Sequence, residues 1–555
     1  MSRHTAELLE KHFDTAFAAP DGIKKLRELI LTLAMLGKLV PQDPDEQPAS
    51  ELLQEIEVEK QRLMKEGKIK KPKSLPPIRE EEKLYSLPRG WEWARLQSFS
   101  DYNGRPNIDP SEIAEDTWLL DLEDIEKETS RLICRARYFQ RESKSTKSTF
   151  KEGDVLYGKL RPYLDKVLVA DSAGACTTEI VPIVPSKAVI PEFLRWLLKR
   201  PDFLSHVNTL MYGVKMPRLG TEDAIHSVHP IPPVNEQYRI VAKINELMIR
   251  CDGLEKLRTA QKKTRLTVHA AAIKQLLNIA EPDQHQRAQI FLAEHFGELY
   301  TVKEDVAELR KVILQLAMMG KLVPQDPKDK PASELLKEIE EKKRRLVKQG
   351  KIKKPKPLPP VTEGEKPYAL PQGWEWVRFF ATNTVKSELV SAGDFPDENQ
   401  IAPDSIEKDT GSLLLHRTVA ESGATGPNNR FYEGQILYSK IRPSLNKAVV
   451  APYDGLCSAD MYPIVCHVCT DFMLKVILSE TFLAQVRLAE NRIKMPKLNL
   501  ESLGQFLIPL PPLAEQRHIV ARTDQLMNLC DLLAQQIDAA TIKQAELLGA
   551  VIAQV

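Results

Sequence analysis

The chain has little of what marks several large classes of protein. It has only 7 cysteines in 555 residues, and they do not form the regular framework of a disulfide-rich domain. No apolar run approaches the roughly 18–20 residues that a membrane span needs. The N-terminus, MSRHTAELLEKHFDTAF, lacks the apolar core of a signal peptide. These absences predict a protein of a reducing compartment with no membrane segment, most simply a cytoplasmic one.

An excess of charge of one sign is also missing. The net charge is +1, so the molecule is not a uniformly basic protein such as a histone. Any surface for nucleic acid must therefore come from local charge asymmetry. A chain of 555 residues is too long for a single hydrophobic core, and we expect several domains.

Catalytic motifs are absent from the sequence. There is no HExxH, no GxSxG and no GxGxxG placed after a predicted strand. An amino-methyltransferase would carry [DNS]PP[YFW], which IPPV (231–234) and LPPL (510–513) do not match. No helicase-type motif is present. The sequence therefore predicts that this chain alone is not an enzyme.

Two patterns come close to known sites and fail. GDVLYGKL (153–160) has the glycine and lysine spacing of a phosphate-binding loop, but Leu160 replaces the Ser or Thr that binds magnesium. The second copy, GQILYSKI (434–441), lacks the second glycine. Cys466 and Cys469 form a CxxC without the second pair that a zinc site needs, so buried strand thiols are the favoured interpretation. We expect neither a cofactor nor a metal ion in this chain.

The chain contains two copies of one unit. Residues 26–78 and 309–361 align without a gap at an offset of 283, with 38 of 53 positions identical. The similarity fades over about 150 residues and returns as PIPPVNEQYRIVAKI (230–244) against PLPPLAEQRHIVART (509–523). The two copies share a frame and differ in their inserts. A duplicated frame that presents two different surfaces suggests that the protein recognises two different things.

Each copy opens with a helical arm. Residues 23–36 have the apolar spacing of a helix that ends at Gly37. Pro48 suits the first position of the next helix, which continues to about Gly67. The basic, proline-rich segment 68–77 then predicts an extended linker. The same succession recurs in the second copy.

A GWEW motif introduces each insert, in LPRGWEWARL (87–96) and LPQGWEWVRF (370–379). Short apolar runs separated by glycines and prolines follow. This texture predicts two strand-rich, mixed α/β domains over 84–232 and 367–511.

A long helix with a heptad seam follows each insert. The first seam is formed by Ile240, Ile244, Leu247, Cys251 and Leu254, and the second by Ile519, Thr523, Leu526, Cys530, Leu533 and Ile537. Two seams in one chain most simply pack on each other. The pattern therefore predicts a coiled coil, or more generally a helical hairpin, with Cys251 and Cys530 as small core residues.

Basic residues recur at matching positions of the two inserts. YGKLRPYLDKV (157–167) aligns with YSKIRPSLNKA (438–448), and GVKMPRLG (213–220) aligns with RIKMPKLN (492–499). In a strand, alternate residues share a face, so Tyr157, Lys159 and Arg161 would line one side and could meet phosphates or base edges. A solvated strand face or an ordinary turn is the alternative. The candidate DNA-binding residues are Tyr157, Lys159, Arg161, Lys166, Lys215, Arg218, Tyr438, Lys440, Arg442, Lys447, Lys494 and Lys497.

The order of these motifs resembles that of a known family. The duplicated frame, the GWEW motifs, the PPxxEQxxI segments that lead into the long helices and the KIRP-type elements are together similar to the specificity (S) subunit of type I restriction–modification systems. The resemblance covers nearly the whole chain. It implies an α+β protein of two pseudo-repeated units, each a target recognition domain attached to long helices packed as an antiparallel coiled coil.

The resemblance also implies a division into six segments. These are a helical arm and linker (1–83), a first target recognition domain (84–234), a central conserved coiled-coil helix (235–282), a second arm and linker (283–366), a second target recognition domain (367–513) and a C-terminal conserved coiled-coil helix (514–555).

The function that the resemblance implies is recognition of a bipartite, asymmetric site in double-stranded DNA, one half-site for each domain. Two methyltransferase (modification) subunits would bind the chain, bring S-adenosylmethionine and methylate adenine. Restriction or translocase subunits would add chemistry that depends on ATP and Mg²⁺. The alternatives are a coiled-coil scaffold that binds proteins rather than DNA, a self-contained enzyme and a transcription regulator.

Overall fold

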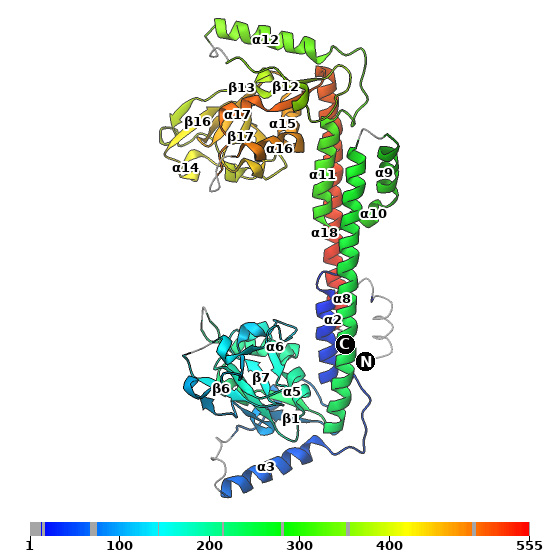
Figure 1. The fold of residues 1–555 in the computed structure, drawn as a ribbon, viewed down its shortest axis with the longest axis vertical. Helices are drawn as coiled ribbons and strands as arrows, with labels where there is room; N and C mark the ends of the chain where they lie inside the picture. Colours follow the sequence, from blue (N-terminus) through cyan, green and yellow to red (C-terminus); the bar gives the residue numbers. More distant parts are fainter. Residues whose placement is uncertain are drawn as a thin grey trace. The chain divides into compact units, whose positions relative to one another are not determined.

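The computed structural model describes residues 13, 17–66, 75–141, 144–213, 216–278, 282–350, 356–490 and 496–553. The chain forms two compact units, each of which is described here by itself (Figure 1). Unit 1 comprises Met1–Lys262 and Thr541–Val555, and unit 2 comprises Lys263–Ala540. Within the described residues, no helix is both long and apolar enough to cross a membrane.

Two helices form the arm of each unit, α2 (Gly22–Met35) and α3 (Ala49–Lys65) in unit 1 and α11 (Lys303–Met318) and α12 (Ala332–Lys348) in unit 2. Gly37 has a φ of 66° just beyond α2, which confirms it as the predicted helix stop. Pro48 lies one residue before α3 rather than at its first position, because Ala49 is the first helical residue.

Unit 1 contains a strand-rich domain of three sheets. The strands are β1 (Glu92–Arg95), β2 (Ser100–Tyr102), β3 (Asn107–Ile108), β4 (Trp118–Leu120), β5 (Ala136–Arg137), β6 (Lys147–Phe150), β7 (Val155–Gly158), β8 (Val167–Val169), β9 (Gly174–Thr177), β10 (Ile180–Pro185) and β11 (Val228–Ile231). The sheets have the orders β1-β11, β2-β10-β7-β8 and β3-β6-β9-β4-β5. The helices of this domain are α4 (Leu96–Phe99), α5 (Pro191–Leu198), α6 (Pro201–Leu210) and α7 (Thr221–His226).

Unit 2 repeats this plan with a smaller outer sheet. Its strands are β12 (Glu375–Arg378), β13 (Asn383–Val385), β14 (Leu389–Ser391), β15 (Gln400–Ile401), β16 (Pro427–Phe431), β17 (Ile436–Ser439), β18 (Ala448–Val450), β19 (Gly455–Ser458), β20 (Met461–Cys466) and β21 (Leu507–Leu510). The orders are β12-β21, β13-β20-β17-β18 and β14-β16-β19-β15. The helices are α13 (Phe379–Thr382), α14 (Val419–Ser422), α15 (Thr470–Leu478), α16 (Glu480–Ala489) and α17 (Leu500–Gln505).

The cores explain why the two domains share one plan. The sheets β2-β10-β7-β8 and β13-β20-β17-β18 are each covered by a helix pair, with α5 packed on β8 and on α6 in unit 1 and α15 packed on β18 and on α16 in unit 2. Phe193 of α5 and Phe472 of α15 are fully buried in these cores. Burying one aromatic side chain of this kind contributes about 1.5–3 kcal/mol, so the helix pair and the sheet stabilise each other.

The long helices are α8 (Val234–Leu277) and α18 (Leu513–Ala553), and each crosses the boundary between the units. The predicted seam of α18 packs on the arm of its own unit, where Cys530 shares a core cluster with Val306 and Ile313 of α11. In unit 1, Arg27 of α2 forms an ion pair of 2.6 Å with Asp252 of α8. The prediction that the two seams pack on each other did not include α2 and α11, which take part of that surface.

Cys251 and Cys530 are both buried, which confirms their prediction as core residues. Two further helices of unit 2, α9 (Pro282–Glu294) and α10 (Phe296–Leu299), lie between α8 and α11 in the sequence. They pack on the end of α8 through Ala272 and Leu276.

A buried hydrogen bond ties each GWEW motif to the start of a long helix. Trp91 Nε1 donates to Glu236 Oε2 at 3.0 Å, and Trp374 Nε1 donates to Glu515 Oε2 at 2.8 Å. All four side chains are buried. The GWEW motif at the start of each insert and the EQ segment at its end are thus in direct contact. This contact holds the two ends of the inserted domain together.

The glutamine that follows each glutamate completes this junction. Gln237 accepts from the N–H of Ile190 at 2.9 Å and donates to Ala188 O at 2.7 Å. Gln516 accepts from the N–H of Cys469 at 3.1 Å. Buried backbone groups need partners, and this amide supplies them where the strand-rich domain meets the helix. The EQ pair is therefore a structural element of the frame.

The buried glutamate gives the junction a pH dependence. Burial raises the pKa of Glu236 from its ordinary value of 4.5 to about 7, against the opposing effect of the Trp91 hydrogen bond. A raised carboxyl pKa means that the folded state prefers the neutral acid. Its contribution to stability is therefore fully present below the unfolded-state pKa and is lost as the pH rises through about 7.

We expect the melting temperature of the wild-type protein to fall between about pH 5 and about pH 8 more steeply than that of Glu236→Gln. Glutamine keeps an acceptor for Trp91 and cannot ionise. Thermal unfolding across a pH series measures the difference, with the exposed Glu51→Gln as the control. Parallel pH profiles for the wild type and Glu236→Gln would contradict the assignment.

Candidate nucleic-acid interface

The KLRP and KIRP segments form loops, which corrects the prediction that Tyr157, Lys159 and Arg161 line one strand face. Strand β7 ends at Gly158, and a short 3₁₀ helix, η5 (Pro162–Leu164), follows. Arg161 precedes η5 in the left-handed region, with φ 50° and ψ 58°. Because β7 stops before Lys159, the alternation of side chains along a strand does not extend to Arg161.

The second copy has the same loop. Strand β17 ends at Ser439, and Arg442 precedes η9 (Pro443–Leu445) with φ 44° and ψ 52°. A left-handed conformation costs an L-residue other than glycine about 1–2 kcal/mol. Its presence in both copies, at an arginine followed by proline, shows that the surrounding contacts determine the loop.

The structure places Tyr157 and Tyr438 in the core, not on the exposed strand face that the sequence analysis assigned to DNA. Tyr157 is 4% exposed and Tyr438 is 1% exposed, and both lie in the main core of their unit. Burial raises the pKa of both phenols well above the ordinary value. These rings stabilise the sheet that carries the loop and cannot reach a ligand.

Lys166 and Lys447 hold the loops to a neighbouring segment. Lys166 Nζ donates to Leu122 O of η3 (Leu122–Asp124) at 2.6 Å. Lys447 Nζ donates to Pro403 O of η8 (Pro403–Ser405), also at 2.6 Å. Desolvation lowers the pKa of Lys166. The structure thus gives both ammonium groups an internal role that the sequence analysis did not anticipate.

Arg218 and Lys497 form matching ion pairs. The Arg218 guanidinium lies 2.7 Å from Glu179, and its Nε donates to the same carboxylate at 3.0 Å. Lys497 Nζ lies 3.1 Å from Asp460. These pairs offset the charge that the sequence analysis assigned to DNA. Their acidic members, Glu179 and Asp460, are absent from the sequence prediction because they are distant in sequence from the basic motifs.

The backbone joins the two predicted basic segments into one surface in each domain. The N–H of Arg161 donates to Pro217 O at 2.7 Å, and the N–H of Arg442 donates to Pro496 O at 2.8 Å. Lys215 and Lys494, the remaining members of the second segments, lie outside the described residues.

Arg161 and Arg442 are the cations that these loops present to solvent. Both side chains are exposed, and neither guanidinium has a hydrogen-bond or ion-pair partner within the described part of the chain. Lys159 and Lys440 are half-buried beside them, and Lys440 Nζ lies 5.4 Å from the ring centroid of Tyr462. Each domain thus presents a loop whose arginine has a fixed backbone and no partner among the residues that the structure describes.

A buried ion pair supports this loop in unit 1. Lys199 Nζ donates to Asp165 Oδ2 at 2.6 Å, to Glu128 O at 2.8 Å and to Ser130 Oγ at 2.8 Å. Burial raises the pKa of Asp165 to about 6, although Lys199 acts against the shift. In unit 2, Asn446 takes the matching place and donates to Leu478 O at 3.1 Å. The second copy has no lysine that matches Lys199. Comparison of the two sequences therefore gives no sign of this ion pair.

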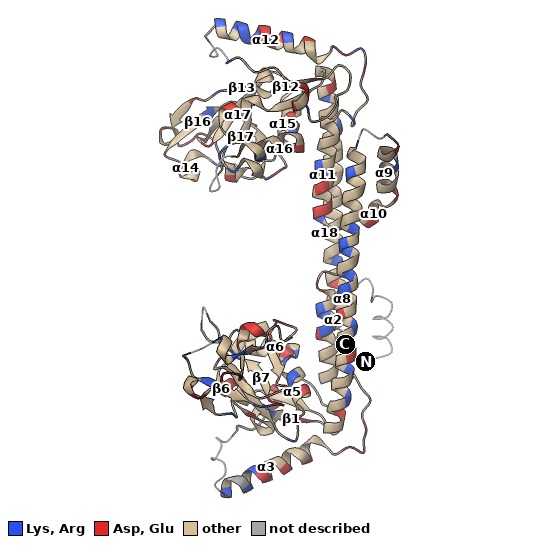
Figure 2. Cartoon of the chain, in the orientation of Figure 1, with Lys and Arg blue, Asp and Glu red and all other residues tan. Residues whose placement is uncertain are grey.

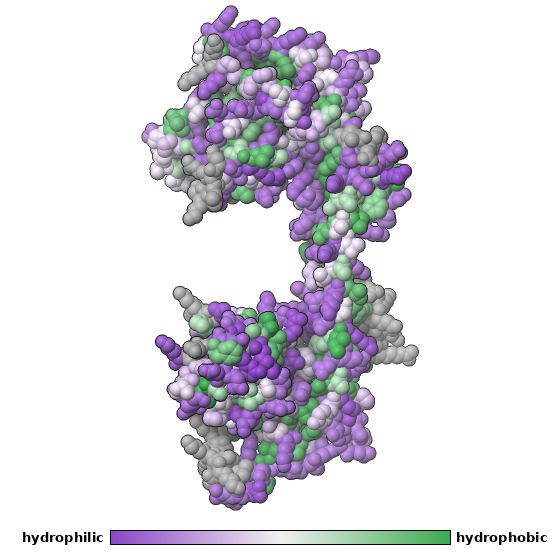
Figure 3. All heavy atoms as spheres, viewed as in Figure 1, coloured by the Kyte–Doolittle hydropathy of each residue, from purple (hydrophilic) through white to green (hydrophobic). Residues whose placement is uncertain are grey.

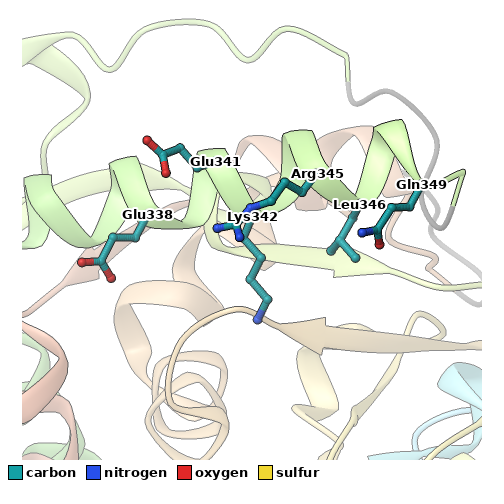
Figure 4. Close-up of a pocket in the computed structure, with 6 residues that line it drawn as sticks. All are labelled: Glu338, Glu341, Lys342, Arg345, Leu346 and Gln349. Carbon is teal, nitrogen blue, oxygen red and sulfur yellow. The ribbon is translucent and has the colours of Figure 1, made fainter.

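A groove of about 550 Å³ lies along α12, and its lining residues, which carry both signs of charge, come from that helix and from Gln349 directly after it (Figure 4). Basic and acidic residues are also interspersed along α3 and α8 (Figure 2). Among the described residues, no cluster of His, Cys, Asp and Glu could hold a metal ion. Cys466 and Cys469 are half-buried rather than buried, and the neighbouring Cys457 is fully buried.

Comparison with known proteins shows to which protein family this chain belongs. A family model described as a type I restriction modification DNA specificity domain matches residues 433–541. The specificity subunit of the type I restriction enzyme EcoAI from Escherichia coli is 34% identical over 577 aligned residues, which cover 95% of this chain and 93% of the relative. This chain belongs to the family of type I restriction specificity subunits. The EcoEI specificity subunit from Escherichia coli is 33% identical over 564 residues, with 95% and 93% covered.

The fold agrees with that of a chain from a solved type I restriction–modification system. A chain in a solved structure of a type I restriction–modification system superposes with a TM-score of 0.52 at 18% identity, over 85% of this chain and 98% of the other. This confirms the predicted mixed α/β class with two repeated strand-rich domains and long helices. As a specificity subunit, the chain has DNA target recognition domains, and a general protein scaffold is not favoured.

Proposed function

We propose that this specificity subunit recognises a bipartite, asymmetric site in double-stranded DNA, with the strand-rich domain of each unit reading one half-site. The observation that supports this most strongly is the pair of loops around Arg161 and Arg442. Two inserts that differ in most of their sequence keep a left-handed, exposed arginine on the same backbone scaffold. Functional sites are where such backbone strain is retained.

The loops suit phosphate binding in particular. A guanidinium without an internal partner keeps its donors available for phosphate oxygens, which it can bind through two parallel hydrogen bonds. The backbone hydrogen bond to Pro217 or Pro496 fixes the direction in which the loop leaves the sheet. Such contacts supply affinity and register but no sequence information, so both domains can share them.

Sequence discrimination then belongs to residues that differ between the domains. A well-placed bidentate contact to a base contributes about 1–3 kcal/mol of discrimination. The outer sheets differ most, because unit 1 has the five-stranded order β3-β6-β9-β4-β5 and unit 2 has the four-stranded order β14-β16-β19-β15. The two recognition domains can bind DNA at the same time only when the distance between the half-sites matches the distance between the domains.

The reaction itself is assigned to partners. We infer that two methyltransferase subunits bind this chain, bring S-adenosylmethionine and methylate adenine, and that restriction or translocase subunits bring ATP and Mg²⁺ chemistry. In this proposal the specificity subunit has no catalytic residue and selects the DNA on which its partners act. The absence of catalytic motifs from the sequence agrees with that division.

Mapping of methylated adenines tests the proposal. The chain is co-expressed with the methyltransferase encoded beside it, in a host without adenine methylation, and genomic DNA is read by single-molecule sequencing. We expect a two-part motif with a fixed gap that disappears when this chain is omitted. Assembly of the complex without any new motif would refute the assignment and favour a scaffold.

A further inference from the structure

The two target recognition domains each expose an apolar side chain at an equivalent position. Ile133 is 62% exposed in unit 1 and Leu414 is 57% exposed in unit 2. The residue after each one is exposed as well, and it is Cys134 in the first domain and Leu415 in the second. The visible surface of both domains is mostly hydrophilic (Figure 3). A single exposed apolar residue is ordinary, but the same position in two divergent domains calls for a reason.

Identical backbone contacts place these residues. The N–H of Ile133 donates to Asp124 O at 2.7 Å, and the N–H of Leu414 donates to Ser405 O at 2.7 Å. These carbonyls belong to η3 and η8, the segments that Lys166 and Lys447 hold. The exposed side chains are therefore fixed by the same contacts in both copies.

The residue before each exposed side chain points the other way. Leu132 and Leu413 form equivalent bridges with Ile125 and Ile406, and both pack against the smaller core of their domain. One apolar residue at this turn, Leu132 or Leu413, is enough to contact the core. The second apolar residue, Ile133 or Leu414, lies in solvent, where burial within the unit does little to stabilise it.

These apolar positions belong to the same loop assembly as the unpaired arginines. In unit 1, the N–H of Glu128 donates to Leu164 O of η5 at 3.0 Å. In unit 2, the N–H of Asp409 donates to Asn446 O at 3.3 Å, directly after η9. The turn that carries the apolar residue and the loop that carries the arginine are thus held together in each domain.

We propose that Ile133 and Leu414 are specificity-determining residues that contact thymine methyl groups in the major groove of their half-sites. The inference rests on the proposed function and names one part of the readout. Apolar side chains recognise thymine through its methyl group. The arginine loop beside them supplies the phosphate contact that sets their register.

The neighbouring arginine loop favours DNA over a protein as the occupant of this surface. Each turn is held to a loop whose exposed arginine, Arg161 or Arg442, has no partner within the described residues. The arginines of the turns themselves form ion pairs within their domains, Arg131 with Glu126, Arg135 with Asp171, Arg141 with Asp124 and Arg417 with Asp404, so they add little to this preference. Ile133 and Leu414 occupy the same position in the two copies, while the residues around them differ. This is expected of two DNA-recognition domains that have a common fold and recognise different bases.

The test uses the assembled complex and the half-sites that the methylation map provides. Duplex DNA is prepared in which each thymine of a half-site is replaced, one at a time, by deoxyuridine, which lacks only the methyl group. Binding is measured for the wild type, for Ile133→Ser and for Leu414→Ser. Leu84→Ser and Leu488→Ser are matched controls, because they remove exposed apolar side chains from unit 1 and unit 2 outside these turns.

We expect the affinity of the wild type to fall about fourfold at one thymine of each half-site, the effect of one buried methyl group. Ile133→Ser should be weakened as much on unmodified DNA and no longer distinguish thymine from deoxyuridine in its half-site, while it keeps that discrimination in the other. Leu414→Ser should show the reverse pattern, and the controls should match the wild type.

Three results would overturn the inference. They are equal binding of thymine and deoxyuridine at every position by the wild type, unchanged discrimination by the serine variants, or loss of methyltransferase assembly in those variants. The last result would identify the surface as a protein contact. If the wild-type complex yields no two-part motif at all, the proposed function fails before this experiment begins, so the two failures are distinguishable.

Discussion

Replacing Arg161 and Arg442 together by alanine is expected to weaken DNA binding by the assembled complex about a hundredfold. A hydrogen bond to a charged group contributes about 1.5–3 kcal/mol, or roughly a factor of ten or more for each arginine. Both side chains are exposed and have no partner within the described residues, so their removal should leave the fold intact. The slope of the logarithm of the binding constant against the logarithm of salt concentration should become shallower by about 0.9 for each phosphate that the variant no longer neutralises.

Two further variants separate binding from folding. Arg161→Gly removes the charge and also the cost of the left-handed backbone. We expect it to bind DNA as weakly as Arg161→Ala and to unfold at no lower temperature. The exposed Arg62→Ala, on α3, serves as the charge control. Full binding by the double alanine variant, with an unchanged salt slope, would show that the loops do not contact DNA.

Replacing Trp91 by alanine is expected to destabilise unit 1 by about 3–5 kcal/mol, the usual cost of removing a large buried aromatic ring. The change also deletes the hydrogen bond to Glu236 and leaves a buried carboxyl group without its donor. Trp91→Phe keeps most of the ring volume and should cost about 1–3 kcal/mol, because only the donor is removed. Amide hydrogen exchange, followed separately for peptides of each unit, measures the effect.

Trp374→Ala provides the matched variant in unit 2, where the indole donates to Glu515. Loss of protection should appear mainly in the unit that carries the substitution, because each junction closes its own domain. If Trp91→Ala changed the free energy of unfolding by less than about 0.5 kcal/mol, the GWEW motif would not be the junction described here.

The frame was largely predictable because it is duplicated. The repeat located the arms, the GWEW motifs and the EQ segments, and the heptads located both long helices. The sequence could not show that Trp91 and Glu236 form one contact, because they are separated by 145 positions. It also could not show that α2 and α11 cover part of the predicted seams, since the heptad pattern reports an apolar stripe and not its partner.

The candidate site was predicted less well, and the reason is one backbone feature. The tyrosine, lysine and arginine of the KLRP segment were assigned to one face on the assumption that the strand continued. The strand ends at Gly158, and Arg161 adopts a φ of 50°, a conformation usually marked in sequence by glycine or asparagine. Tyr157 therefore points into the core while Arg161 lies in solvent. The acids that pair with Arg218 and Lys497 were hidden because contacts distant in sequence leave no local pattern.

The central claim is that each of the two strand-rich domains recognises its own half-site. The most direct test is a methylation map of a chain that carries the same domain twice. Residues 370–511 are replaced by residues 87–232, with the junctions inside the matching GWEW and PP segments. With its methyltransferase, this chain is predicted to modify a motif made of two copies of one wild-type half-site. An unchanged asymmetric motif, from a complex that assembles normally, would contradict the claim that each domain reads its own half-site.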